Sequence, residues 1–118
     1  MGRLSTHILD IAQGRAAQGV LIELFGIAAS GERSLLGTAR TDADGRTANP
    51  LLSGAGFATG TYELCFHIGD YFRASGAHPE QSPFLDVVPV RFAIGDASLH
   101  YHVPLLCTPW SYSTYRGS

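Results

Sequence analysis

The sequence contains no lysine, and all 8 of its basic residues are arginine. Without a lysine amine, the chain cannot form a Schiff base with a carbonyl substrate or use a lysine as a general base. Ten acidic residues outnumber the arginines, so the net charge is −2 at pH 7 with neutral histidines. This balance lacks the basic field that attracts nucleic acid and the polybasic patch that binds anionic lipid. We therefore expect neither nucleic acid nor a membrane as a partner.

Cysteine is also scarce, and long hydrophobic runs are missing. No stretch approaches the roughly 18 apolar residues that a membrane-spanning helix needs. The 2 cysteines, Cys65 and Cys107, stand in apolar, strand-like segments without a CxxC pair. We expect both to be buried, reduced thiols; the alternative is a single disulfide between them. Residues 1–7 lack the apolar core of a secretory signal, so we expect a cytoplasmic protein.

Short apolar segments separated by turn-forming residues make up most of the chain. A length of 118 residues predicts a single domain, residues 1–118. Gly76 and Pro79 limit the one expected helix, and Pro89 places its strand at a sheet edge or near the strand's start. The pattern predicts an all-β sandwich with one short helix over residues 71–80. The expected strands are 5–10, 19–27, 33–41, 61–68, 87–94, 99–107 and 112–115, with a brief one around 51–52.

Histidines are the first candidates for chemistry. In a strand, His100 and His102 point to one face and Tyr101 to the other. Two histidines on one face can bind a metal or perform acid–base work, although a polar, half-exposed strand face explains the same pattern. His7 in the first strand and Arg46 after an Asp-Gly turn are further candidates. The chain has no obvious carboxylate pair, nucleophile elbow, Walker loop, HExxH or dinucleotide fingerprint, so spacing alone leaves the reaction open.

The tail carries unusual chemistry for the end of a chain, which is ordinarily frayed. Tyr115, Arg116, Gly117 and Ser118 bring together a phenol, a guanidinium, a flexible glycine and a hydroxyl. If Ser118 ends the protein, its terminal carboxylate is ionised at neutral pH. The density of functional groups predicts that the tail forms part of a site.

Four segments occur together in the order of one known family. They are LSTHILD over residues 4–10, TDADGR over 41–46, GDYF over 69–72, and the stretch from HYHVPLL to SYSTYRGS over 100–118. This combination closely resembles the transthyretin-related 5-hydroxyisourate hydrolases of purine breakdown. The likeness covers essentially the whole chain, and its C-terminal stretch is the most specific part.

The resemblance implies a fold, an assembly and a set of site residues. The fold would be a transthyretin-like (prealbumin-like) sandwich of two four-stranded sheets with one short helix. The assembly would be a homotetramer, a dimer of dimers, with active sites in the channel between the dimers. The family's functional residues match His7, Arg46, His102 and the tail from Tyr115 to Ser118. His100 matches a common family residue that neighbours the catalytic histidine and is not itself the usual catalytic one.

The resemblance also implies a reaction, the hydrolysis of 5-hydroxyisourate to 2-oxo-4-hydroxy-4-carboxy-5-ureidoimidazoline in urate degradation. No metal and no other cofactor is required. His7 would be the general base and His102 the group that positions or protonates the substrate, with the reverse order left open. Arg46 would stabilise the oxyanion. Catalytic roles are thus predicted for His7, Arg46, His102 and Ser118, and substrate binding for His7, Arg46, Tyr115, Arg116 and Gly117.

Two other functions remain open from the sequence. The first is a non-enzymatic carrier of small aromatic ligands, as transthyretin is. Transthyretin, however, lacks a histidine at the position of His102 and does not end in YRGS, so these features of this sequence argue against a carrier. The second is a zinc-binding β-domain that uses His100, His102 and another histidine. A hydrolysis assay beside a ligand-binding assay separates the first from the hydrolase, and metal analysis separates the second.

Overall fold

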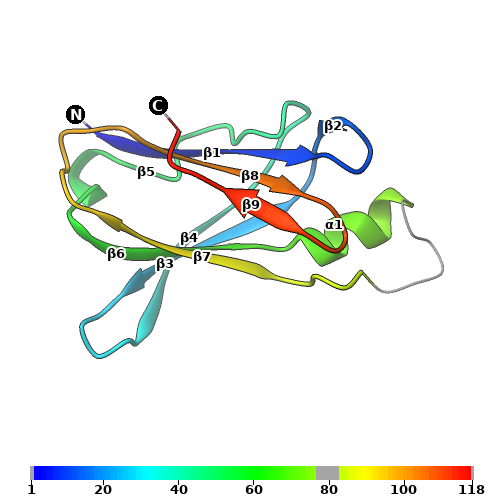
Figure 1. Ribbon diagram of the computed structural model, residues 1–118. Coiled ribbons are helices and arrows are strands. Elements are labelled where there is room, and N and C mark those ends of the chain that lie inside the picture. The colour runs from blue at the N-terminus through cyan, green and yellow to red at the C-terminus, as the bar shows by residue number, and fades with distance from the viewer. Residues whose placement is uncertain (1, 77–82, 118) are drawn as a thin grey trace.

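Two packed β-sheets with one short α-helix form the molecule, as the computed structural model shows (Figure 1). The structure describes residues 2–76 and 83–117. The predicted all-β sandwich with one short helix is confirmed. The strands are β1 (Arg3–Asp10), β2 (Arg15–Ala16), β3 (Leu21–Ile27), β4 (Arg33–Arg40), β5 (Leu52–Ser53), β6 (Gly60–Phe66), β7 (Val88–Ile94), β8 (Tyr101–Cys107) and β9 (Tyr112–Thr114); the helices are α1 (Ile68–Ser75) and a single 3₁₀ turn, η1 (Gly54–Gly56).

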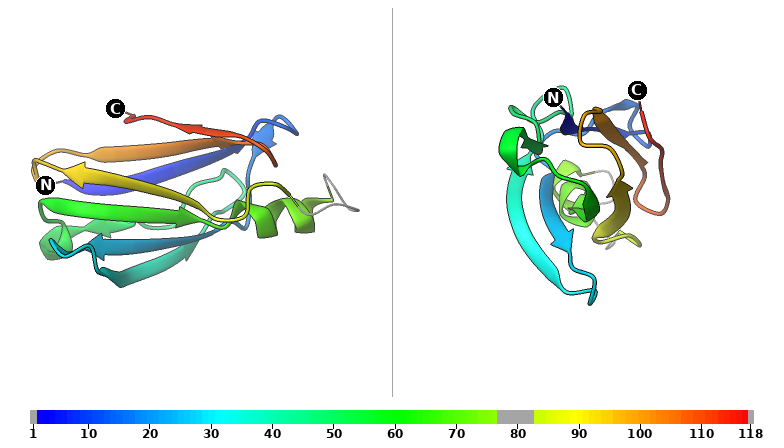
Figure 2. Two further views of the ribbon diagram at one scale, coloured as in Figure 1. Left: turned by 60° about the horizontal axis from the view of Figure 1, so that its bottom comes forward. Right: turned by 90° about the vertical axis from the view of Figure 1, so that its left-hand side faces the viewer.

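The first sheet runs β2-β1-β8-β9, and the second runs β4-β3-β6-β7. The two layers are clearest in the end-on view of Figure 2. The first sheet has five strands rather than four, because β5 also pairs with the start of β1. Both β2 and β5 are two residues long, so they extend the edges of β1 without changing the sandwich. Pro89 lies in the edge strand β7, one residue after its start, as predicted.

The pairing that matters for the site joins β1 to β8 in parallel. Ser5 lies opposite His102, and His7 lies opposite Pro104. Directly paired residues point to the same side of a sheet, so all four side chains share one face. The alternating burial of β1 shows that this face is the outer one, because Leu4, Thr6, Ile8 and Asp10 are buried. The outer face of β1 and β8 therefore brings together residues from the two ends of the chain.

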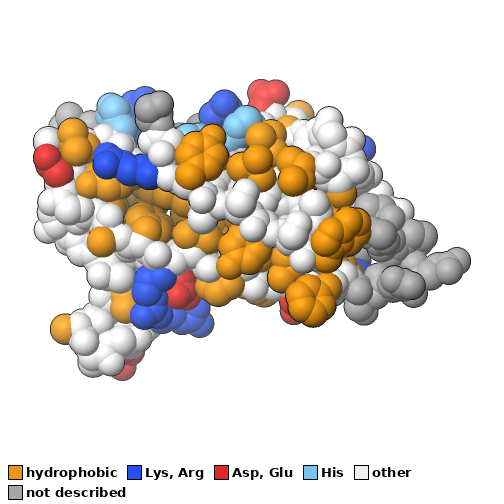
Figure 3. All heavy atoms as spheres, viewed as in Figure 1, with side chains coloured by type: hydrophobic (Ala, Val, Ile, Leu, Met, Phe, Trp, Pro, Cys, Tyr) orange, Lys and Arg blue, Asp and Glu red, His pale blue; other side chains and the backbone are white. Residues whose placement is uncertain are grey.

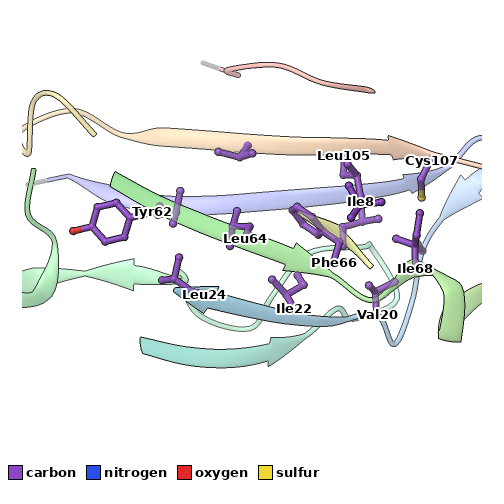
Figure 4. Close-up of a cluster of buried hydrophobic side chains, with 14 of the residues drawn as sticks. Ile8, Val20, Ile22, Leu24, Tyr62, Leu64, Phe66, Ile68, Leu105 and Cys107 are labelled. Atoms are coloured by element: carbon purple, nitrogen blue, oxygen red, sulfur yellow. The ribbon is translucent and has the colours of Figure 1, made fainter. Parts of the chain in front are cut away.

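The hydrophobic core fills the space between the sheets (Figure 4). Complete burial of an aliphatic or aromatic side chain contributes about 1.5–3 kcal/mol, so this layer holds the sheets together. Both cysteines are buried and unpaired, as predicted. The core side chains labelled in Figure 4 are Ile8, Val20, Ile22, Leu24, Tyr62, Leu64, Phe66, Ile68, Leu105 and Cys107.

Helix α1 begins earlier than the sequence pattern predicts. The strand expected to reach Ile68 ends at Phe66, and the helix starts at Ile68 rather than at Tyr71. Gly69 lies in the first turn of this helix and allows close packing, because a Cβ there would lie 2.7 Å from Oδ1 of Asp86. The helix ends at Ser75, and Gly76 caps it in the left-handed conformation. The remaining predicted helical residues, 77–80, lie outside the described residues.

Candidate active site

The turn after β4 carries Arg46 and fastens it to β1. The Asp42 carboxylate accepts hydrogen bonds from the backbone N–H groups of Asp44 and Arg46, at 2.9 and 3.1 Å. Gly45 adopts a φ of 75°, which only glycine accepts readily, and its carbonyl accepts a 2.9 Å hydrogen bond from the Ile8 N–H. The predicted Asp-Gly turn is therefore confirmed. It places Arg46 beside the strand that carries His7.

The same turn fixes the protonation pattern of His7. Nε2 of His7 lies 2.8 Å from the carbonyl oxygen of Asp44. A carbonyl oxygen can only accept, so Nε2 carries the proton and donates it. In the neutral ring, Nδ1 is then the unprotonated nitrogen. His7 is thus held as a tautomer that can take a proton at Nδ1.

His102 lies half-buried on β8, two residues along the shared face from His7. Its Nδ1 is 2.8 Å from the hydroxyl oxygen of Ser5. Burial, with Arg46 and then His7 as further causes, lowers the pKa of His102 below its ordinary value. These electrostatic effects place Arg46 and both histidines in one neighbourhood. His102 is therefore neutral at physiological pH, in contrast to the charged Arg46.

The tail reaches this neighbourhood through its backbone. The Gly117 N–H donates a 2.7 Å hydrogen bond to the carbonyl of His102, and the two residues form an isolated bridge. A Cβ on Gly117 would lie 2.6 Å from Cδ2 of His102, so only glycine allows this approach. Ser118 lies outside the described residues.

The side chains of Tyr115 and Arg116 lie elsewhere. The Arg116 guanidinium stacks over the ring of Tyr101, 4.4 Å from its centroid, and donates to the His100 carbonyl at 3.5 Å. Tyr115 and Arg116 line a groove of about 270 Å³ between β7 and the β8–β9 side of the first sheet. One chain therefore brings together His7, Arg46, His102 and Gly117, and points the other two tail side chains into a separate groove.

A small cavity lies beside Arg46 and Ser5, the residue whose hydroxyl contacts His102. Its volume is about 170 Å³, and its wall is formed by Ser5, Thr6, Arg46 and residues 47–50. In the space-filling view, histidine side chains lie along the edge of the molecule that carries β1 and β8 (Figure 3). The Arg46 side chain thus lines the cavity, and both His102 and His7 lie in its electrostatic neighbourhood. These groups suit the activation of water and the stabilisation of an oxyanion.

Two further histidines, His67 and His100, do not join this site. His100 precedes β8 and is exposed, so the expected HxH strand face contains only His102. His67 precedes α1 and binds the Glu23 carboxylate at 2.6 Å on the second sheet. His78 lies outside the described residues. Across residues 2–76 and 83–117, no three histidine, cysteine, aspartate or glutamate side chains are placed to hold a metal ion.

Ser5 contacts a predicted site residue, His102, but the sequence pattern did not single it out. The signal for it was present, since Ser5 alternates with His7 along one strand and so shares its face. What the pattern lacked was the register of β1 against β8, which brings Ser5 opposite His102.

Comparison with known proteins identifies the family. Residues 4–117 match the model of the HIUase/Transthyretin family. The chain belongs to this family. It is 56% identical over 117 residues to 5-hydroxyisourate hydrolase 2 of Rhizobium meliloti (strain 1021), with 99% of this chain and 97% of that protein covered. The predicted family is confirmed.

Solved structures of the HIUase/Transthyretin family and its relatives confirm the fold. Klebsiella pneumoniae 5-hydroxyisourate hydrolase matches with a TM-score of 0.79 and 37% identity, and each chain is covered completely. Sea bream transthyretin in complex with thyroxine matches with a TM-score of 0.87 and 30% identity, over 98% of this chain and 94% of that one. An (S)-allantoin synthase matches with a TM-score of 0.91 and 43% identity; the match covers 99% of this chain and 44% of that longer chain.

Proposed function

We propose that this protein hydrolyses 5-hydroxyisourate to 2-oxo-4-hydroxy-4-carboxy-5-ureidoimidazoline. The observation that carries the proposal is the 56% identity, along almost the whole chain, to a curated hydrolase of this name. Water adds its oxygen to a ring carbonyl carbon, the adjacent C–N bond breaks, and the freed nitrogen takes a proton. The reaction consumes only substrate and water.

The chain's own groups divide this work. Nδ1 of His7 takes the proton from water, because Nε2 of the same ring is held by the Asp44 carbonyl. The guanidinium of Arg46 stabilises the negative charge that develops on the carbonyl oxygen. His102, which is neutral at physiological pH, positions the substrate and supplies a hydrogen bond.

The tail completes the site in an assembled protein. Gly117 lies against His102, whereas Tyr115 and Arg116 line the groove beside β7. A single chain therefore does not present all the proposed substrate-binding groups to one cavity. We propose a homotetramer, a dimer of dimers, in which Tyr115 and Arg116 bind substrate and Ser118 contributes to catalysis where chains meet. A planar guanidinium suits bidentate binding of a polar heterocycle.

The carrier alternative is weaker than the hydrolase. The transthyretin structure with thyroxine shares the fold, but its identity to this chain is 30%. Curated relatives at about twice that identity are hydrolases.

We also propose a cytoplasmic location, which the unpaired state of both cysteines supports. Among the described residues, no helix is both long and apolar enough to cross a bilayer.

An ultraviolet assay tests the function. Urate and urate oxidase generate 5-hydroxyisourate in place, and the protein is then added. We expect the absorbance of 5-hydroxyisourate to disappear far faster than it does spontaneously. Unchanged decay with folded protein would refute the proposed function.

Two substitutions test the site within the same assay. His102→Asn and Arg46→Ala should each lower turnover about 100-fold or more, as loss of an acid–base or oxyanion group does. His67→Asn and Arg40→Ala are the matched controls, because His67 precedes α1 and contacts Glu23 of β3, and Arg40 lies on β4 of the second sheet. Near-native turnover in either site variant would show that its residue is not catalytic.

A further inference from the structure

The His102 ring has a side-chain partner that the proposed mechanism does not use. Ser5 Oγ and His102 Nδ1 lie 2.8 Å apart, although the two residues are separated by 97 positions in the chain. They face each other directly in the parallel β1–β8 ladder. The contact is therefore set by sheet register rather than by a mobile loop.

The Ser5 hydroxyl can supply the proton in this contact. His102 is neutral at physiological pH, so its ring has one N–H and one bare nitrogen. Within the part of the chain that the structure describes, the Ser5 hydroxyl makes no other hydrogen bond than the one to His102. A hydroxyl satisfies its proton by donating it to an available acceptor, and Nδ1 is that acceptor. The ring proton of His102 then sits on Nε2.

We propose that Ser5 is a positioning residue that holds neutral His102 as its Nε2–H tautomer, a hydrogen-bond donor to the substrate. This inference rests on the proposed function, because it gives His102 a task in that reaction. The tail supports the same ring from another side, since Gly117 packs against Cδ2. Ser5 and Gly117 together fix the direction in which Nε2–H points.

The two histidines are then complementary. The Asp44 carbonyl takes the Nε2 proton of His7 and leaves Nδ1 of that ring able to accept. The Ser5 hydroxyl gives its proton to Nδ1 of His102 and leaves Nε2 of that ring able to donate. One ring accepts the proton of water and the other donates to the developing oxygen or the leaving nitrogen. The partner groups, rather than the rings themselves, decide which histidine is the base.

Nitrogen NMR tests the tautomer without any substrate. In histidine-labelled ¹⁵N protein at neutral pH, we expect His102 to show a bare Nδ1 and a protonated Nε2. In Ser5→Ala, the two tautomers of His102 should mix, while the His7 signals stay unchanged. A protonated Nδ1 in the wild-type ring, or an unchanged His102 pattern in Ser5→Ala, would overturn the proposal. This readout remains valid even if the substrate assay fails.

Kinetics test whether Ser5 acts through His102. We expect Ser5→Ala to lower kcat about 5- to 10-fold with little change in KM, the scale of one neutral hydrogen bond. Ser5→Thr keeps the hydroxyl and should restore most of the activity. Ser53→Ala is the control, because Ser53 is an exposed serine on β5, which pairs with the same strand.

A double-mutant cycle separates positioning from a general structural effect. If Ser5 acts through His102, adding Ser5→Ala to His102→Asn should cost no further activity. Additive losses would show that Ser5 acts independently of His102, and wild-type kcat in Ser5→Ala would show that it does not act at all. Either result would refute the proposed role.

Discussion

His102 is a residue whose charge is decided by its neighbours. Burial, Arg46 and His7 lower its pKa, so the folded protein binds this proton less readily than the unfolded chain does. As the pH falls, the unfolded state therefore binds more protons at His102 than the folded state does. The contribution of His102 to stability is therefore complete above the ordinary histidine pKa of about 6.5. It is lost as the pH drops from there through the lowered pKa of the folded state.

Removing the Arg46 charge should reverse part of this shift. In Arg46→Gln we expect the pKa of His102 to rise toward its ordinary value, because a positive charge no longer opposes protonation. An NMR titration of the His102 ring measures the change directly. Arg40→Gln, on the far sheet, is the control and should leave the titration where it is. An identical His102 titration in Arg46→Gln would contradict this account.

Gly117 is a residue whose lack of a side chain matters. In Gly117→Ala the new Cβ would meet the His102 ring at 2.6 Å, so the ring or the tail must move. We expect turnover to fall about 10-fold or more, because small displacements of a catalytic group are costly, with little change in the thermal midpoint. Gly37→Ala is matched, since a Cβ there meets nothing within 4 Å. Equal turnover in the two variants would show that the tail does not support His102.

At the scale of elements, the Asp42–Arg46 turn has two tasks, because it carries Arg46 and holds His7. Gly45 makes this possible with a positive φ and a close approach to the Ile8 carbonyl. We expect Gly45→Ala to lower the free energy of unfolding by more than the roughly 1–2 kcal/mol of the left-handed conformation alone. Urea unfolding measures it. Gly31→Ala is the control, because Gly31 has a φ of 90° and open space around its Cβ position. Equal losses in both variants would contradict the packing role.

Elements also show what the sequence could predict. Short apolar segments between turn-forming residues predicted β1 and β8, although the strand expected to start at residue 99 begins at Tyr101. The start of α1 was mistaken, since Gly69 resembles a turn residue when its packing partner Asp86 is unknown. The convergence of His7, Arg46 and His102 was implied only by family resemblance. Periodicity gives the face of a strand, but it does not give the register between strands far apart in sequence.

At the scale of the whole molecule, the tail is divided between two places: Gly117 lies against His102, whereas Tyr115 and Arg116 line the groove beside β7. The proposed tetramer would unite these groups, and its existence can be tested. We expect light scattering to give the mass of four chains at micromolar concentration. Arg116→Ala should keep that mass and lower turnover, because the proposed role of Arg116 is in substrate binding. A monomer with full activity would refute both the tetramer and the shared site.

The parallel pairing of β1 with β8 also has a consequence for how the protein is made. β1 is synthesised long before β8, so its buried face and its backbone edge remain without this partner while most of the chain is still being translated. Distant pairings of this kind form slowly compared with hairpins. During that interval Leu4 and Ile8 are exposed apolar residues of the sort that chaperones bind. In the nascent chain the residues of the proposed site are therefore still apart, and we expect activity to begin only when β8 has paired with β1.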